Sequence, residues 1–309
     1  FHWQTGPFCL VRRIVRLLRE YPVPQSRAKP EGFDIEPRNR RFDIEEVAAT
    51  DWHGGSPVRT AIFNALSLMF PVGEQYFIDT VKRLRERVTD PVLLEEVAGF
   101  TAQEAIHSRE HSRYNDAVCA TRGLSVEKLE APIRRRIRWA QKYRPPLEHL
   151  AMTVAYEHLT AILADAMFRN PATLDGAHPE MAALWHWHGL EETEHKAVAF
   201  DVLKAVTRPG TFYFLRVRSL LMATIFFNIN LFLHIRNLLA VERMQWSPRA
   251  WGRLAHYLWI NPGPLRKSIP AYLDWFKPSF HPWQHDNREL VAEWKEAHGE
   301  EPAHTATAA

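Results

Sequence analysis

The sequence predicts an all-α protein, in which a four-helix bundle is followed by an additional C-terminal helical segment. Apolar residues recur at helical spacing over most of the chain, and no segment keeps the alternating pattern of a strand. Capping residues, prolines and glycines divide the chain into helix-sized pieces. Four of these pieces carry glutamate or histidine within an otherwise apolar stripe. Polar groups of that kind are stable in a core only when they are paired, so the four stripes are predicted to face one another.

The first elements precede the bundle. Residues 8–20 predict a short basic amphipathic helix, and the prolines within 22–42 predict a loop. The first bundle helix is predicted to begin at Ser56 and Pro57, because serine caps a helix and proline fits its first turn. It should run to about residue 87. Pro71 and Gly73 predict a kink or a restart within it.

The remaining bundle helices are delimited in the same way. Asp90 and Pro91 open the second bundle helix, and Gly123 is placed to end it. The predicted segments are 91–122, a connecting helix over 125–143, then 147–168 and 179–206.

A strongly apolar helix is predicted over residues 211–243, after the bundle. Its uncharged run, 219–233, is 15 residues long and includes Asn228 and Asn230, whereas a membrane span needs about 20 residues. A buried or dimer-interface helix is therefore the main prediction. A helix lying on a membrane surface and a spanning helix are the alternatives.

These elements predict four regions. They are an N-terminal helix and loop over 1–56, the bundle over 57–207, a C-terminal helical appendage over 208–297 and a disordered tail over 298–309.

Composition excludes several classes of protein. The formal net charge of +3 is too balanced to indicate a nucleic-acid binder. The two cysteines, Cys9 and Cys119, support neither a disulfide framework nor a thiolate metal site. Two cysteines without paired spacing fit a reducing compartment, so a cytoplasmic protein is expected. A homodimer is the expected assembly. The basic clusters within 12–19 and 134–144 predict, as an alternative, peripheral contact with the anionic inner face of a membrane.

Two Glu-x-x-His pairs carry the strongest functional signal. They are Glu104 with His107 and Glu192 with His195. Positions i and i+3 share one face of a helix, so each helix can offer a carboxylate and an imidazole to the same ion. A lone glutamate precedes each pair by about one helix and a turn: Glu74 before the first and Glu157 before the second. Four carboxylates and two histidines in this order are typical of a dimetal site inside a four-helix bundle.

Two further histidines lie on the same helix faces. His111 follows His107, and His188 precedes Glu192, each within about 60° of the ligand pair on a helical wheel. His188 is predicted to be an additional ligand. For His111 three roles stay open: a ligand, a hydrogen-bond partner of a ligand, or a buried histidine.

The donor set favours iron, with manganese as the alternative, because it offers oxygen and imidazole ligands without thiolate. Zinc usually takes fewer, four-coordinate ligands. Two ions are therefore expected.

Over about residues 57–206 the order of these ligands resembles the ferritin-like di-iron oxygenase superfamily. His188 is similar to the additional iron-binding histidine of the p-aminobenzoate N-oxygenase family. The wider sequence, including the segment Phe280-His281-Pro282-Trp283, also resembles a bacterial family catalogued as predicted metal-dependent hydrolases.

The leading hypothesis is an oxygenase or oxidase in which two iron ions activate O2 toward a small or lipophilic organic substrate. Such chemistry consumes electrons, so an electron-donating reductase is a candidate partner. The alternative is a hydrolase in which the same two ions activate water. A ferroxidase or iron-handling protein is disfavoured, since such a protein needs no long appendage and the chain offers no acidic iron pathway.

Overall fold

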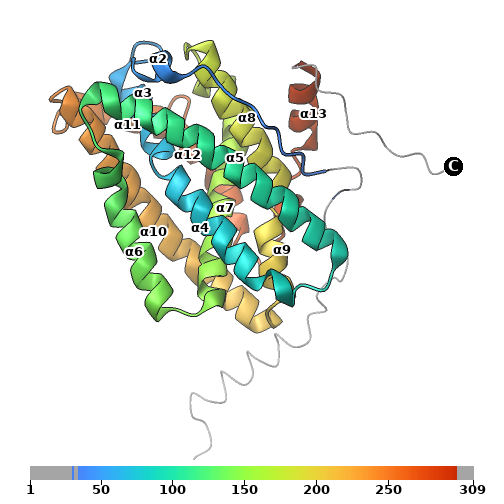
Figure 1. Cartoon of the computed structure of the whole chain (residues 1–309). Coiled ribbons are helices and arrows are strands. Elements are labelled where there is room, and N and C mark those ends of the chain that lie inside the picture. The colour runs from blue at the N-terminus through green and yellow to red at the C-terminus, as the bar shows by residue number, and fades with distance from the viewer. Residues whose placement is uncertain (1–29, 31–33, 298–309) are drawn as a thin grey trace, which may run out of the picture.

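The computed structural model describes residue 30 and residues 34–297, and this part of the chain is built from helices (Figure 1). Within it, extended backbone pairs only at an isolated bridge between His53 and Ala177. The all-α prediction is therefore confirmed for the described residues. The predicted helix at 8–20 and the predicted tail at 298–309 lie outside them.

The helices follow one another with short connections. The first group is α2 Glu45–Ala48, α3 Pro57–Ser67, α4 Phe70–Leu84, α5 Pro91–Arg122, α6 Val126–Tyr143, α7 Pro146–Phe168, α8 Pro179–His195 and α9 Val198–Ala205. The second group is α10 Pro209–Val241, α11 Pro248–Trp259, α12 Pro264–Asp274 and α13 Arg288–Ala297. The short 3-10 segments are η1 Arg85–Arg87, η2 Pro171–Thr173 and η3 Pro282–Gln284.

Capping residues start the helices where the sequence predicted. The Ser56 side chain accepts a hydrogen bond from the backbone N–H of Arg59 at the start of α3. The Asp90 carboxylate accepts the backbone N–H of Val92 at 3.0 Å and so caps α5. Gly123 ends α5 with a φ of 63°, a left-handed conformation that favours glycine.

The helix restarts between α3 and α4, as Pro71 and Gly73 predicted, so the region predicted over 57–87 contains two separate helices and the short η1. Pro71 has no N–H to donate to the carbonyl of Ser67, and its ring crowds that turn. The Asn115 side chain donates to the Ser67 carbonyl instead, at 2.9 Å. The Ser67 carbonyl is therefore paired despite the break.

Two further boundaries differ from the prediction. The helix predicted over 179–206 is interrupted by a turn at Lys196 and Ala197, which separates α8 from α9. Periodicity does not reveal this turn, because both segments bury apolar residues. The apolar helix predicted over 211–243 begins two residues earlier, because Pro209 is a first-turn residue of α10.

Four helices form a closed ring of contacts. Helix α4 packs on α5 and α7, and α8 packs on the same two helices. Helices α10 and α12 pack on α7 from outside this ring, and α6 contacts α4, α5 and α7 (Figure 1). The predicted appendage is therefore in direct contact with the helices of the predicted bundle. The predicted division into regions at 56, 207 and 297 stays a prediction.

Helix α10 has one buried and one exposed side. By length and composition it could cross a membrane. In its most apolar stretch of 18 residues, 39% is buried inside the protein. Buried residues such as Leu220, Ala223 and Leu231 pack toward the interior, where α10 contacts α3 and α7. The exposed side carries a stripe of large apolar residues, the α10 stripe: Phe214, Leu221, Ile225, Ile229 and Phe232.

Candidate metal centre

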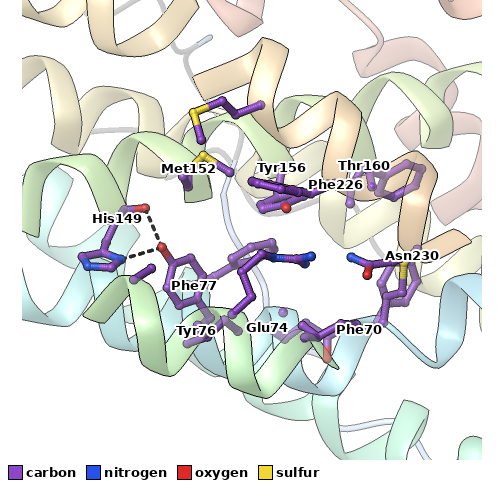
Figure 2. Close-up of a pocket in the computed structure, with 18 of the residues that line it drawn as sticks. Phe70, Glu74, Tyr76, Phe77, His149, Met152, Tyr156, Thr160, Phe226 and Asn230 are labelled. Atoms are coloured by element: carbon purple, nitrogen blue, oxygen red, sulfur yellow. Dashed lines mark hydrogen bonds between the residues drawn. The ribbon is translucent and has the colours of Figure 1, made fainter. Parts of the chain in front are cut away.

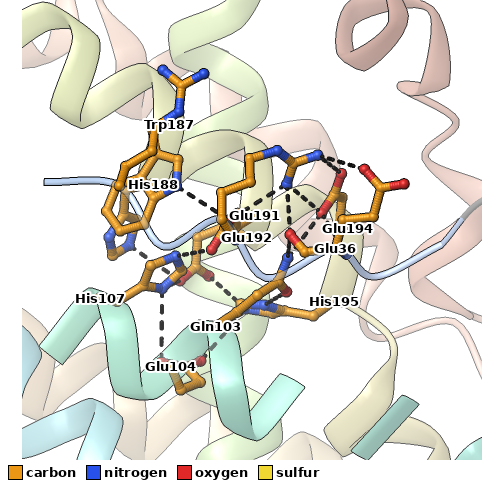
Figure 3. A network of polar contacts seen from close by, with 12 residues as sticks. Glu36, Gln103, Glu104, His107, Trp187, His188, Glu191, Glu192, Glu194 and His195 are labelled. Carbon is orange, nitrogen blue, oxygen red and sulfur yellow. Dashed lines mark hydrogen bonds and ion pairs between the residues drawn. The ribbon is translucent and has the colours of Figure 1, made fainter. Parts of the chain in front are cut away.

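The seven side chains predicted to bind metal come from the four helices of the ring, and they meet in its interior. They are Glu74 on α4, Glu104 and His107 on α5, Glu157 on α7, and His188, Glu192 and His195 on α8. None is more than 4% exposed. Figure 3 shows how the residues from α5 and α8 point toward one another.

The potential ligand atoms form two groups. One oxygen of Glu74 and one nitrogen each of His107 and His188 lie within 4.8 Å of one another. Atoms of Glu104, Glu192 and His195 form a second group within the same distance. Glu157 joins this second group, since its Oε2 lies 3.4 Å from the Nε2 of His195. The same nitrogen also lies near carboxylate oxygens of Glu104 and Glu192.

Two glutamates reach both groups. Glu104 places Oε1 3.5 Å from His195 Nε2 and Oε2 4.0 Å from His107 Nδ1. Glu192 places Oε1 3.1 Å from His188 Nε2 and Oε2 3.7 Å from His195 Nε2. This is the disposition expected of carboxylates that bridge two ions.

The atoms facing this interior lack hydrogen-bond partners in the described part of the chain. They are both carboxylate oxygens of Glu74, Glu104 and Glu157, together with His107 Nδ1, His188 Nε2 and His195 Nε2. A buried polar atom without a partner costs free energy, and a buried carboxylate costs more. Oxygen and nitrogen lone pairs that converge in this way fit a metal cation. The residues present therefore suit the dimetal site that the ligand order predicted.

The buried carboxylates also create a negative electrostatic potential that favours a bound cation. Burial raises the pKa of Glu74 and Glu104 well above their usual range, and neighbouring carboxylates raise it further. Burial likewise raises the pKa of Glu157 to about 8. Burial alone would lower the pKa of His195, but Glu192 and Glu157 raise it to about 8. The same field that attracts a proton to His195 Nε2 would attract a metal ion.

Hydrogen bonds behind two of the histidines fix which nitrogen faces the interior. His107 Nε2 lies 2.9 Å from a Glu191 carboxylate oxygen, which can only accept when ionised, so Nδ1 carries the lone pair. His195 Nδ1 lies 2.9 Å from Gln103 Oε1. The Gln103 amide donates to Glu194 Oε2 at 2.8 Å, and this sets the oxygen toward His195.

A chain of hydrogen bonds fixes His188 in the same way. The Ser67 hydroxyl donates to Asn115 Oδ1 at 2.7 Å and therefore accepts from His111 Nδ1 at 2.8 Å. His111 Nε2 is then an acceptor for His188 Nδ1 at 2.9 Å. His188 Nε2 is left with its lone pair toward Glu192. Of the three roles left open for His111, this geometry matches the hydrogen-bond partner of a candidate ligand.

Sequence analysis missed most of the residues behind the histidines. Glu191 lies off the face of α8 that carries His188, Glu192 and His195, but its side chain reaches across to α5. Burial raises the pKa of Glu191 to about 7, against the lowering effect of Arg38. The Arg38 guanidinium also lies 2.8 Å from Glu194 Oε1. Arg38 belongs to the extended segment before α2, and no local pattern links that segment to the site.

Two apolar cavities reach the centre. The larger encloses about 170 Å³ and includes Glu74, Thr160 and Glu192 in its walls. The smaller encloses about 90 Å³ and is lined by His188, Thr160 and Glu192. The Thr160 hydroxyl donates to Glu192 Oε2. Substrate could thus approach the carboxylates through apolar surroundings.

Comparison with known proteins gives one match. Neither the search of curated proteins nor the search of solved structures found a match. The resemblance to di-iron oxygenases therefore stays a hypothesis. A family model described as "Predicted metal-dependent hydrolase" matches residues 36–286, a range that contains every candidate ligand. On that match, the chain belongs to the family of predicted metal-dependent hydrolases.

Proposed function

We propose that this protein is a metal-dependent hydrolase that holds two metal ions in a ferritin-like four-helix bundle and acts on a lipophilic substrate. One observation carries the proposal: carboxylate oxygens and imidazole nitrogens from four helices converge in an apolar interior without partners in the described residues. Family membership supports hydrolysis, which sequence analysis had placed second to oxygenation.

The proposed ligands divide between two ions. Glu74, His107 and His188 would hold one ion, Glu157 and His195 the other, and Glu104 and Glu192 would be shared. Iron and manganese suit these oxygen and nitrogen donors. When bound, such ions supply Lewis acidity that acidifies water and polarises a carbonyl or phosphoryl group.

The chain's own side chains would position the reactants. Glu74 forms part of the wall of the larger cavity, so a substrate in that cavity would lie beside this candidate ligand. Thr160 holds Glu192 in orientation through its hydroxyl. Phe70 and Phe227 line both cavities and would exclude bulk water from the reacting groups.

A second function, O2-dependent oxidation, is favoured by one specific observation. The proposed ligands comprise seven side chains without a thiolate, and all are buried. This donor set is also typical of di-iron carboxylate proteins. The ligand set serves either reaction, so the two functions are separated by the need for O2.

The test is metal-dependent ester hydrolysis with and without oxygen. The protein would be stripped with a chelator, reloaded with Mn²⁺ or Fe²⁺, and assayed on 4-nitrophenyl esters from acetate to dodecanoate under air and under argon. We expect metal-dependent hydrolysis at equal rates in both atmospheres, with preference for the longer esters. Glu104→Ala should abolish it, whereas Glu127→Ala, at an exposed position on α6, should not.

Hydrolysis that persists in the stripped protein or in Glu104→Ala would overturn the proposal. Absence of hydrolysis together with consumption of O2 by the reduced, iron-loaded protein would replace it with the oxidative function.

A further inference from the structure

The larger cavity has a direction, from the surface among α6, α7 and α10 to the candidate metal centre. Its inner end is formed by Glu74 and Glu192, which are 2% and 3% exposed. At its outer end lie Trp139, 57% exposed, and Arg144, whose side chain is 42% exposed. A ligand that enters from solvent therefore meets the outer residues first.

The wall between these ends is apolar. Figure 2 shows Phe70 and Phe77 facing Met152, Tyr156 and Phe226 across the space. A hydrocarbon segment placed here would leave water for apolar surroundings, at about 0.8 kcal/mol for each buried methylene group. The apolar wall favours a hydrocarbon chain over a polar molecule.

The outer end is positively charged. Three arginines line it, the rim arginines Arg136, Arg144 and Arg218, against a single glutamate, Glu148. Glu148 pairs with Arg144 at 3.0 Å and with Arg218 at 2.7 Å. The Arg136 guanidinium lies 4.5 Å from the centre of the Phe226 ring, and it has no carboxylate within ion-pair distance in the described part of the chain. The rim can therefore accept an anion.

We propose that this cavity binds a single-chain anionic amphiphile, with its carboxylate or phosphate group at the rim arginines and its hydrocarbon segment extended toward Glu74 and Glu192. Guanidinium groups form charge-assisted hydrogen bonds with carboxylates and phosphates. Binding in this orientation depends only on the cavity and its lining residues, and not on the proposed hydrolase activity. A substrate of the proposed hydrolase would in addition need an ester or similar hydrolysable bond at the inner end of this segment, beside Glu74 and Glu192, and this addition rests on the proposed function.

Binding is tested by displacement of a fluorescent fatty acid, 11-(dansylamino)undecanoic acid, from the purified full chain. Dodecanoate and dodecyl phosphate should displace the probe, octanoate should do so more weakly, and dodecyltrimethylammonium should not. Arg136→Ala should weaken dodecanoate binding about 10-fold or more, the scale of a lost hydrogen bond to a charged group. Arg138→Ala, exposed on the same helix and outside the cavity, is the matched control.

A second variant tests the apolar wall. Met152→Trp should fill the cavity and reduce the preference for dodecanoate over octanoate. Equal displacement by the cationic amphiphile, an unchanged affinity in Arg136→Ala, or no dependence on chain length would each overturn the proposal. Binding of dodecanoate without ester hydrolysis would leave this site standing and reject the hydrolase, and the reverse result would reject this site alone.

A further arm of the experiment identifies the source of the amphiphile. Displacement by lysophosphatidylglycerol, a single-chain membrane lipid, as well as by dodecanoate would show that the site accepts a lipid headgroup. Displacement by dodecanoate alone would show that it takes free amphiphiles.

Discussion

At the level of single residues, hydrogen bonds behind the histidines decide which nitrogen faces the candidate metal centre. His188 depends on His111 and Ser67 for its orientation, and His107 depends on Glu191. Such outer partners typically contribute 10- to 100-fold to the affinity of a metal site. Their loss should therefore weaken metal binding without removing a ligand.

We predict that His111→Phe lowers Mn²⁺ affinity about 10- to 100-fold. His188→Ala should weaken one of the two proposed ions further and leave the other in place, because the second group of ligands is intact. Isothermal titration of the stripped protein measures both effects. The control is His234→Phe, a buried histidine on α10 outside both groups. Unchanged affinity in His111→Phe would mean that the hydrogen-bond chain does not position His188.

A second residue-level prediction concerns pH. His53 is fully buried between Trp52, Phe63 and Tyr257, and both of its ring nitrogens lack partners in the described residues. Burial lowers the pKa of His53 to about 4 from its ordinary value of 6.5. Between these values the unfolded chain binds the proton and the folded chain does not. The free energy of unfolding should therefore rise with pH from about 4 to 6.5 and level off above that range.

The prediction is tested by urea unfolding of wild type and His53→Phe at pH 7.5 and pH 5.5. Lowering the pH by one unit below 6.5 costs about 1 kcal/mol per such histidine. The difference in unfolding free energy between the two pH values should shrink by about that amount in His53→Phe. Comparing each protein with itself removes any constant effect of the substitution. An equal difference in both proteins would show that His53 does not contribute.

At the level of elements, the extended segment before α2 lies directly on α5. A Cβ added at Gly99 would lie 2.9 Å from Ile35 Cγ2 and 3.3 Å from the Ile35 backbone oxygen. The backbone of Ile35 cannot move aside without displacing the segment that carries Arg38. Glycine at this position thus lets the segment reach the carboxylates behind the candidate metal centre.

We predict that Gly99→Ala destabilises the protein. Overpacking costs about 1–3 kcal/mol, and the higher helix propensity of alanine recovers about 1 kcal/mol of this. Gly252→Ala on α11, where an added Cβ meets nothing within 4 Å, should instead be neutral or stabilising. Thermal unfolding of the two variants provides the comparison. A Gly99→Ala protein as stable as Gly252→Ala would contradict the close contact.

At the level of the whole molecule, the α10 stripe leaves a large apolar face uncovered. Five large apolar side chains lie along it, and each is at least 44% exposed. Surfaces of this kind mark contacts with a membrane or another protein. The rim arginines and the basic cluster of α6 provide positive charge that suits an anionic membrane surface.

We predict that the protein is recovered in the soluble or peripheral fraction, and that washing with high salt releases any membrane-bound part. Cell fractionation with salt, carbonate and detergent steps measures this, and Ile225→Ser with Phe232→Ser should reduce the bound part. Release by detergent alone would indicate that α10 is inserted. A dimer in gel filtration that the double variant dissociates would assign the stripe to the homodimer predicted from sequence.

The sequence by itself determined where most helices begin and which side chains are candidate ligands. Caps such as Ser56 and Asp90 act on their own helix, and Glu104 with His107 shares a helix face, so local spacing is sufficient to predict both. The turn after His195 escaped prediction, because apolar periodicity continues across it. Only the tertiary structure placed Glu191 and Arg38 behind the histidines and set the rim arginines at the end of a cavity. Those contacts join residues far apart in the chain, where helical periodicity carries no information about which elements meet.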